Sequence, residues 1–81
     1  MIYLEIITPD KKVFEGEVKL IQLPGSKGGF EVLKNHAPII STLEKGTVRI
    51  VDVNNREQLF EVDGGVIENK GNKIIVLVES A

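Results

Sequence analysis

The feature that most constrains the fold of this chain is an alternation of apolar side chains with a period of two. Ile2, Leu4 and Ile6 fall on one side of an extended segment, and Tyr3 and Glu5 fall on the other. This period is typical of a β-strand with one buried face. Apolar residues nowhere recur at the three-four spacing of an amphipathic helix over about ten positions. The sequence therefore predicts an all-β fold with essentially no helix.

Turn-forming residues divide the rest of the chain into short strands. Strand signals recur every eight to twelve residues or so, which favours a two-sheet β-sandwich or flattened barrel of about ten short strands. The apolar run at 73–79 predicts a strand covered on both faces, or one that closes a barrel. We expect a single domain over residues 1–81, with further strands at 39–43, 47–53 and 57–62, a three-residue hairpin loop at 44–46, turns at 54–56 and 69–72, and a break or bulge at 63–65.

The apolar pattern changes phase between residues 17 and 23. Val18 and Leu20 share one face, whereas Ile21 and Leu23 point the other way. Such a slip indicates a bulge, or a strand that bends from one sheet into another. Several strands also carry apolar residues opposite their main buried face, which predicts either strands that switch sheets or an outer docking patch. These residues are Tyr3, Ile7, Ile21, Leu23, Leu59 and Ile67.

Composition excludes several classes of function. The 81 residues carry a formal net charge of −2 and no basic run, which argues against non-specific nucleic-acid binding. The chain has no cysteine, so a disulfide or a Cys-ligated metal site is excluded. No apolar run approaches the roughly 20 residues of a membrane-spanning helix, and the first residues do not resemble a signal peptide. These features favour a cytosolic protein.

Residues 23–41 form the least regular stretch, with three of the eight glycines, two of the three prolines and the only histidine. A catalytic triad would require distant strands to bring Ser41, His36 and a carboxylate together, so we favour a histidine that bonds to loop backbone or to a partner. The glycines lack the following helix of a phosphate-binding loop. The acidic residues near the start of the chain are dispersed, so we expect no metal, no cofactor and no catalysis.

Several motifs, in order along the whole chain, resemble the N-terminal domain of the epsilon subunit of the F-type ATP synthase. Each motif is weak alone, but the His-Ala-Pro motif followed by the later Gly-Gly pair is specific. The motifs are Thr8-Pro9-Asp10, Phe14-x-Gly16-x-Val18, Leu23-Pro24-Gly25, Asn35-His36-Ala37-Pro38-Ile39-Ile40, Gly46-x-Val48-x-Ile50, Val62-x-Gly64-Gly65-x-Ile67-Glu68 and Asn72-x-Ile74-x-Val76-Leu77.

The resemblance implies a non-catalytic rotor subunit of the central stalk, which links the gamma subunit to the membrane c-ring and couples ion flow to ATP synthesis. It implies a peripheral position on the cytoplasmic face of the bacterial inner membrane. The alternative from another class is a free-standing β-sandwich that binds an unrelated protein. Carried over residue by residue, the resemblance implies contacts with gamma at His36, Pro38, Ile40 and Thr42, and with the c-ring at Ser26, Lys27, Gly28, Gly29, Phe30 and Glu31.

Two departures from the family pattern bear on these expectations. The family usually has glycine where Glu31 stands and often proline where Lys34 stands, so we expect either a differently shaped loop beside the c-ring or a charged contact with it. Longer relatives continue into two C-terminal helices, whereas this sequence ends at Ala81. We expect a naturally short form without that helical hairpin, and therefore no ATP binding and no inhibition by helix insertion.

Overall fold

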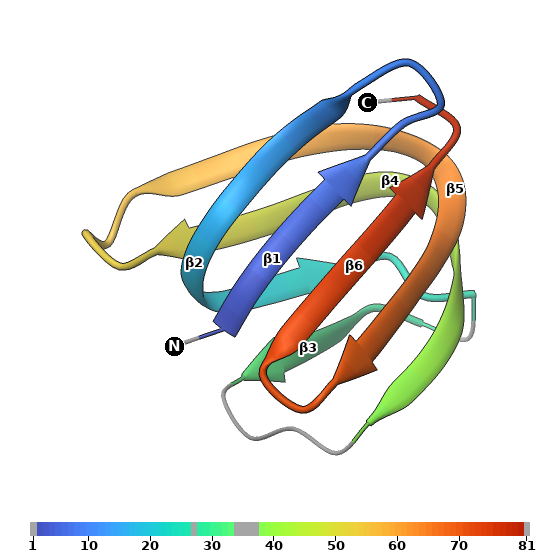
Figure 1. Ribbon diagram of the computed structural model, residues 1–81. Helices are drawn as coiled ribbons and strands as arrows, with labels where there is room; N and C mark the ends of the chain where they lie inside the picture. Colours follow the sequence, from blue (N-terminus) through green and yellow to red (C-terminus); the bar gives the residue numbers. More distant parts are fainter. Residues whose placement is uncertain (1, 27, 34–37, 81) are drawn as a thin grey trace.

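The computed structural model describes residues 2–26, 28–33 and 38–80. The predicted contact residues Lys27 and His36, and the departure at Lys34, lie outside them. All regular structure among the described residues is β-strand, as predicted, and none of it is a helix that could cross a membrane. The strands are β1 (Ile2–Ile7), β2 (Lys12–Leu23), β3 (Phe30–Leu33), β4 (Ile39–Asp52), β5 (Glu57–Lys70) and β6 (Lys73–Val78) (Figure 1).

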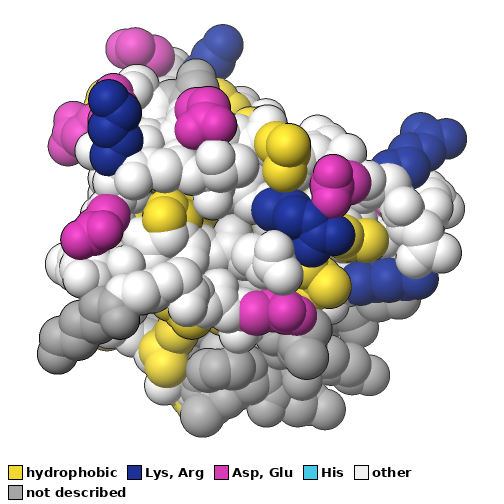
Figure 2. Space-filling view, turned by 180° about the vertical axis from the view of Figure 1, so that it is seen from behind, with side chains coloured by type: hydrophobic (Ala, Val, Ile, Leu, Met, Phe, Trp, Pro, Cys, Tyr) yellow, Lys and Arg dark blue, Asp and Glu magenta, His cyan; other side chains and the backbone are white. Residues whose placement is uncertain are grey.

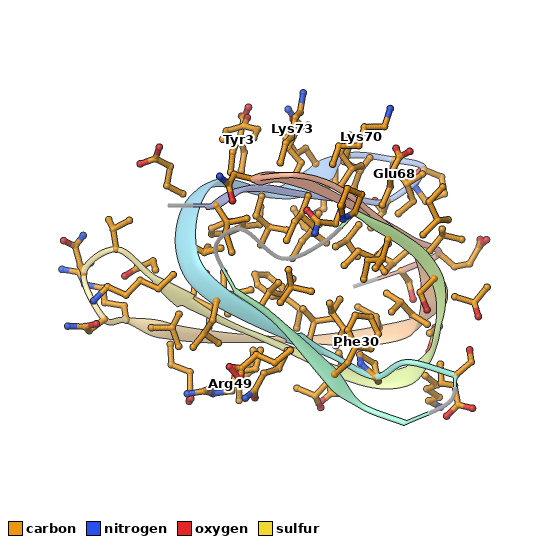
Figure 3. All side chains as sticks on the ribbon, turned by 90° about the horizontal axis from the view of Figure 1, so that it is seen from below. Tyr3, Phe30, Arg49, Glu68, Lys70 and Lys73 are labelled. Atoms are coloured by element: carbon orange, nitrogen blue, oxygen red, sulfur yellow. The ribbon has the colours of Figure 1, made fainter. Side chains whose placement is uncertain are left out.

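Five of these strands form a closed ring. Their order is β1-β6-β5-β4-β2, and β2 pairs with β1 to complete it, while β3 adds to the other end of β2. β1 and β6 run parallel, and the other pairs are antiparallel. Seen from below, the ring is flattened into two layers with side chains packed between them (Figure 3). The prediction of a flattened barrel is confirmed.

The predicted number of strands was wrong: the described residues form six strands, not about ten. The expected hairpin loop at 44–46 lies inside β4, and the expected break at 63–65 lies inside β5. These segments face each other with an unchanged register, since Leu43 lies opposite Gly65 and Gly46 lies opposite Val62. Gly64, at a φ of 107°, supplies a torsion that favours glycine. Both strands therefore bend together without losing their pairing.

These bends let β2, β4 and β5 contribute to both layers. One layer contains β1, β6, the first halves of β2 and β4, and the second half of β5. The other contains β3, the second halves of β2 and β4, and residues 57–62 of β5. The phase slip marks the bend in β2, because the β2–β4 register shifts between Val18 and Leu20 while Val18 and Ile21 are both fully buried.

Three of the six apolar residues that were predicted to lie opposite the main buried face of their strands belong to the core. Ile21, Leu23 and Ile67 are buried because their strands change layers. Leu59 is 60% exposed, and the other two, Tyr3 and Ile7, are half-buried. In β6, Ile74, Val76 and Val78 are buried while Leu77 is exposed, so this strand closes the barrel and is not covered on both faces. The buried residues of all six strands form one hydrophobic cluster.

Candidate functional site

The connection between β2 and β3 contains Gly25, Gly28 and Gly29, and we call it the glycine-rich loop. This loop folds tightly onto itself. A Cβ on Gly25 would lie 2.7 Å from the Phe30 ring and 2.7 Å from the Gly28 carbonyl oxygen. The Gly28 amide also donates to the Gly25 carbonyl at 3.0 Å. Phe30 packs against the core, whereas Ser26, Gly28, Gly29 and Glu31 are exposed. The loop therefore exposes small and polar groups beside the Phe30 ring, which the core holds in place. Only glycine fits at position 25.

The same loop is fastened to β4. The Glu44 amide donates to the Pro24 carbonyl at 2.6 Å, and the Ser26 amide donates to the Thr42 carbonyl at 3.2 Å. The Thr42 hydroxyl donates to the Ser26 hydroxyl at 3.0 Å. The structure thus brings Ser26, expected at the c-ring, against Thr42, expected at gamma. Sequence reasoning had assigned them to separate surfaces, and the hydrogen bonds between the loop and β4 place them together.

The remaining predicted gamma residues lie at the start of β4. Pro38, Ile40 and Thr42 are all exposed, Ile40 to 75%. His36 lies outside the described residues. Nothing in the described structure tests which partner contacts these residues, so their assignment stays a prediction.

An apolar row extends this surface across four strands. Thr42 on β4 pairs with Val66 on β5, Val66 pairs with Leu77 on β6, and Leu77 pairs with Ile7 on β1. Val66 and Leu77 are 39% and 51% exposed. We call Thr42, Val66, Leu77 and Ile7 the four-strand row. The sequence analysis did not predict that Val66 and Leu77 lie on the surface. The apolar residues on both faces of the segment 73–79 could have indicated it for Leu77, because one face of such a strand can lie on the surface.

Charged side chains flank the row on β1 and β2. Tyr3 and Glu5 point to the same outer side as Ile7, because they alternate with the buried residues of β1. The Tyr3 hydroxyl donates to Glu15, and the Lys12 ammonium lies 2.6 Å from Glu5 and 3.2 Å from Glu15. The bond to Glu15 raises the pKa of Tyr3 to about 12, and the same bond lowers the pKa of Glu15. An apolar centre beside a charged rim is the usual composition of a protein-binding surface.

Few other features of the described residues suggest catalysis or metal binding. They contain no group of three His, Asp or Glu side chains placed to hold a metal ion. The Ser41 hydroxyl donates to the Thr42 carbonyl at 3.3 Å, which is a local backbone contact. His36, its predicted partner in the triad hypothesis, lies outside the described part of the chain.

Comparison with known proteins identifies the family. The family model of the β-sandwich domain of the ATP synthase delta/epsilon chain matches residues 1–81. The chain belongs to this family. The ATP synthase epsilon chain of Chlorobaculum tepidum is 43% identical over 76 residues, which cover 94% of this chain and 86% of the relative. The epsilon chain of Campylobacter fetus is 41% identical over 80 residues, but this chain spans only 62% of that relative.

Solved structures share the fold of this ATP synthase epsilon-type domain. A chain of the Euglena gracilis mitochondrial ATP synthase, in a structure of OSCP, F1 and the c-ring, superposes with a TM-score of 0.91 at 18% identity. The match covers 98% of this chain and 51% of that one. A chain from the central stalk and c-ring of the Tetrahymena thermophila enzyme gives a TM-score of 0.77 at 19% identity, over 95% of this chain and 62% of that one. At these identities the likeness concerns the fold.

Proposed function

We propose that this protein is the epsilon-type subunit of an F-type ATP synthase rotor, which binds the gamma subunit on one face and the c-ring at its glycine-rich loop. It transmits torque between them and makes or breaks no bond itself. It acts on the cytoplasmic face of a bacterial inner membrane, held there by its protein partners. Membership of the epsilon-chain family and likeness to central-stalk structures support this assignment.

The observation that carries the proposal is an exposed apolar surface on a rigid closed barrel. The four-strand row and Ile40 share one outer face, since Ile40 and Thr42 are alternate residues of β4. A closed β-barrel with a packed interior deforms little under load and therefore transmits strain. A torque-bearing subunit needs this combination of a stiff body and a large static interface.

The gamma face is tested with Ile40→Asp, because Ile40 is 75% exposed and contributes little to the core. We expect this variant to fold normally and to lose about tenfold or more in affinity for gamma, since a charge is costly in an apolar contact. Val53→Asp at the β4–β5 turn is a matched control, because Val53 is also exposed but lies away from the row. Gamma binding by Ile40→Asp as tight as that of wild type would remove Ile40 from the interface.

The alternative, a free-standing module that binds an unrelated protein, predicts a different outcome. Capture with the wild-type chain from a lysate of its own cells should recover gamma if the rotor assignment is right. Recovery of some other protein in stoichiometric amount, without gamma, would favour the alternative.

A further inference from the structure

The first half of β5 forms an open edge of the layer that contains β3, which we call the second layer. Residues 57–62 pair with β4 on one side, and no described strand pairs with them on the other. The Asp52 amide donates to the Arg56 carbonyl at 3.0 Å, and from this pair onward bonded and non-bonded pairs alternate along the antiparallel ladder. The residues that direct their amides and carbonyls away from β4 are therefore Glu57, Leu59 and Glu61.

The same three residues turn their side chains to the outer face of the second layer. They alternate with Phe60 and Val62, which pack against or within the core. Leu59 is 60% exposed between the two glutamates. Figure 2 looks onto this side of the molecule, where basic, acidic and hydrophobic side chains lie close together. The open edge therefore presents an apolar side chain between two carboxylates, beside backbone groups that can bond to another strand.

The charge of this edge is negative. Residues 57–62 contain two glutamates and no basic side chain. The guanidinium of Arg49, on the neighbouring strand β4, is bound to Glu57. Glu61 accepts a hydrogen bond from the Thr47 hydroxyl at 2.8 Å, and no described basic side chain forms an ion pair with it. Glu61 therefore keeps a charge that a basic side chain of a partner can complement.

The charge pattern disfavours a second copy of this chain at the edge. Two copies paired about a two-fold axis through Leu59 would place Glu57 of one copy directly opposite Glu61 of the other. Like charges directly opposite each other destabilise a pair of strands, and charged edge strands avoid self-association in this way. A strand of opposite charge meets no such repulsion.

We propose that this edge accepts an extended segment of a partner protein as an additional strand, and that this segment carries a basic residue two positions before and two positions after an apolar one. The apolar residue packs beside Leu59, and the two basic residues lie opposite Glu61 and Glu57, the latter shared with Arg49. Backbone bonds along the open edge supply affinity, and the side chains select the sequence. None of these edge residues belongs to the surfaces proposed for gamma and the c-ring, so the inference goes beyond the proposed function and does not rest on it.

The test titrates the synthetic peptide acetyl-Thr-Lys-Val-Val-Val-Lys-Thr-amide into the full 81-residue chain, followed by nuclear magnetic resonance. We expect the amide signals of Glu57, Leu59 and Glu61 to shift and their hydrogen exchange to slow at least about fivefold at saturation. A peptide with glutamate in place of both lysines should bind at least about tenfold more weakly. N-methylation of both lysines and the central valine should abolish binding, because it removes the donors that face the edge.

A pair of charge-reversed variants tests the protein side of the contact. Glu61→Lys should weaken binding of the basic peptide at least about fivefold. Glu17→Lys is the matched control, because it makes the same change of charge at an exposed residue of β2, outside this edge, and its affinity should stay within about twofold of wild type. Both variants should keep the thermal transition of wild type.

Three results would overturn the proposal. One is the absence of binding at millimolar concentrations of the basic peptide. Another is equal binding of the basic and the acidic peptide, or signal shifts confined to other strands. The third is a dimer of the wild-type chain in sedimentation equilibrium that Leu59→Asp dissociates, since this would identify a second copy as the occupant of the edge.

Discussion

Gly65 of β5 lies opposite Val78 of β6 at a position without room for a side chain. A Cβ built on Gly65 would lie 2.1 Å from the Leu77 carbonyl oxygen and 3.0 Å from the Val78 Cα. Backbone atoms cannot move aside as the end of a flexible side chain can. Gly65→Ala should therefore destabilise the protein by about 3 kcal/mol, measured as a lower midpoint of urea denaturation.

Gly29→Ala provides the matched comparison for this prediction. The nearest atom to a Cβ at Gly29 is the Leu23 carbonyl oxygen at 3.6 Å, an ordinary contact distance. We expect its unfolding free energy to stay within about 0.5 kcal/mol of wild type. Equal stability of the two alanine variants would contradict the close approach of β5 and β6.

Tyr3 is the only tyrosine, so its ionisation can be followed directly by ultraviolet absorbance. Its bond to Glu15 raises its pKa from 10.0 to about 12, because deprotonation would remove the donated hydrogen and place two negative groups together. In Glu15→Gln the pKa of Tyr3 should fall toward 10.0, whereas Glu44→Gln on β4 should leave it unchanged. A wild-type midpoint near 10.0 in the folded protein would show that the contact is absent.

The sign of the linked pH effect follows from these shifts. The folded pKa of Tyr3 is raised, so the contact contributes its full stability below pH 10.0, and this is lost as the pH rises toward about 12. The pKa of Glu15 is lowered, so its contribution is present above the ordinary value of 4.5 and is lost as the pH falls through the lowered value. Glu15→Gln should therefore reduce stability most between these two limits.

At the scale of elements, β5 has two unlike halves. Residues 65–69 pair with β4 on one side and β6 on the other, whereas residues 57–62 pair with β4 alone. Hydrogen exchange should separate these halves, because amides at an unpaired edge exchange without any opening of the sheet. We expect every second amide in 57–62 to exchange at least about tenfold faster than the amides of 65–69. Uniform protection along β5 would mean that something covers this edge.

The bends in these strands also show how far local sequence patterns reach. Period two correctly placed Ile2, Leu4 and Ile6 inside, and the phase slip correctly located the bend in β2. The same reasoning failed at Gly46 and Gly64, because a glycine-rich segment has the same composition whether the strand ends there or bends. The difference lies in the partner strand, which bends at the facing residues. The position of the bend in the partner strand depends on residues far apart in the sequence, and a short sequence segment does not contain it.

The candidate surfaces could be anticipated from the sequence only where neighbouring residues form them. Exposed Ile40 and Thr42 lie on β4 and Pro38 directly precedes it, so the family resemblance could group them from a single sequence segment. The four-strand row joins residues from β1, β4, β5 and β6, and a groove lined by Phe30, Arg49 and Leu59 joins the glycine-rich loop to β4 and β5. Both surfaces exist only through the order of strands in the barrel, which no periodicity specifies.

At the scale of the whole molecule, the four-strand row and Glu31 lie on opposite sides of a two-layer barrel, because Glu31 lies beside Arg49 on the outer face of the second layer. Figure 3 shows Tyr3 and Lys73 projecting from one layer and Arg49 projecting from the other. The core separates the two surfaces, and three hydrogen bonds join the glycine-rich loop to β4, among them the one between the Ser26 and Thr42 hydroxyls. Partners on the two sides should therefore bind at the same time without competing.

A double-mutant cycle tests this independence. Ile40→Asp should reduce binding to gamma alone, and Glu31→Lys at the exposed predicted contact should reduce binding to the c-ring alone. In the double variant each loss should match that of its single variant within about twofold, because distant sites with no shared contact act additively. Thr42→Val is the informative third change, since it removes the hydroxyl that bonds to Ser26. If the two surfaces are coupled through that bond, Thr42→Val will change c-ring affinity although Thr42 lies on the gamma side, and a rigid barrel with independent faces will be contradicted.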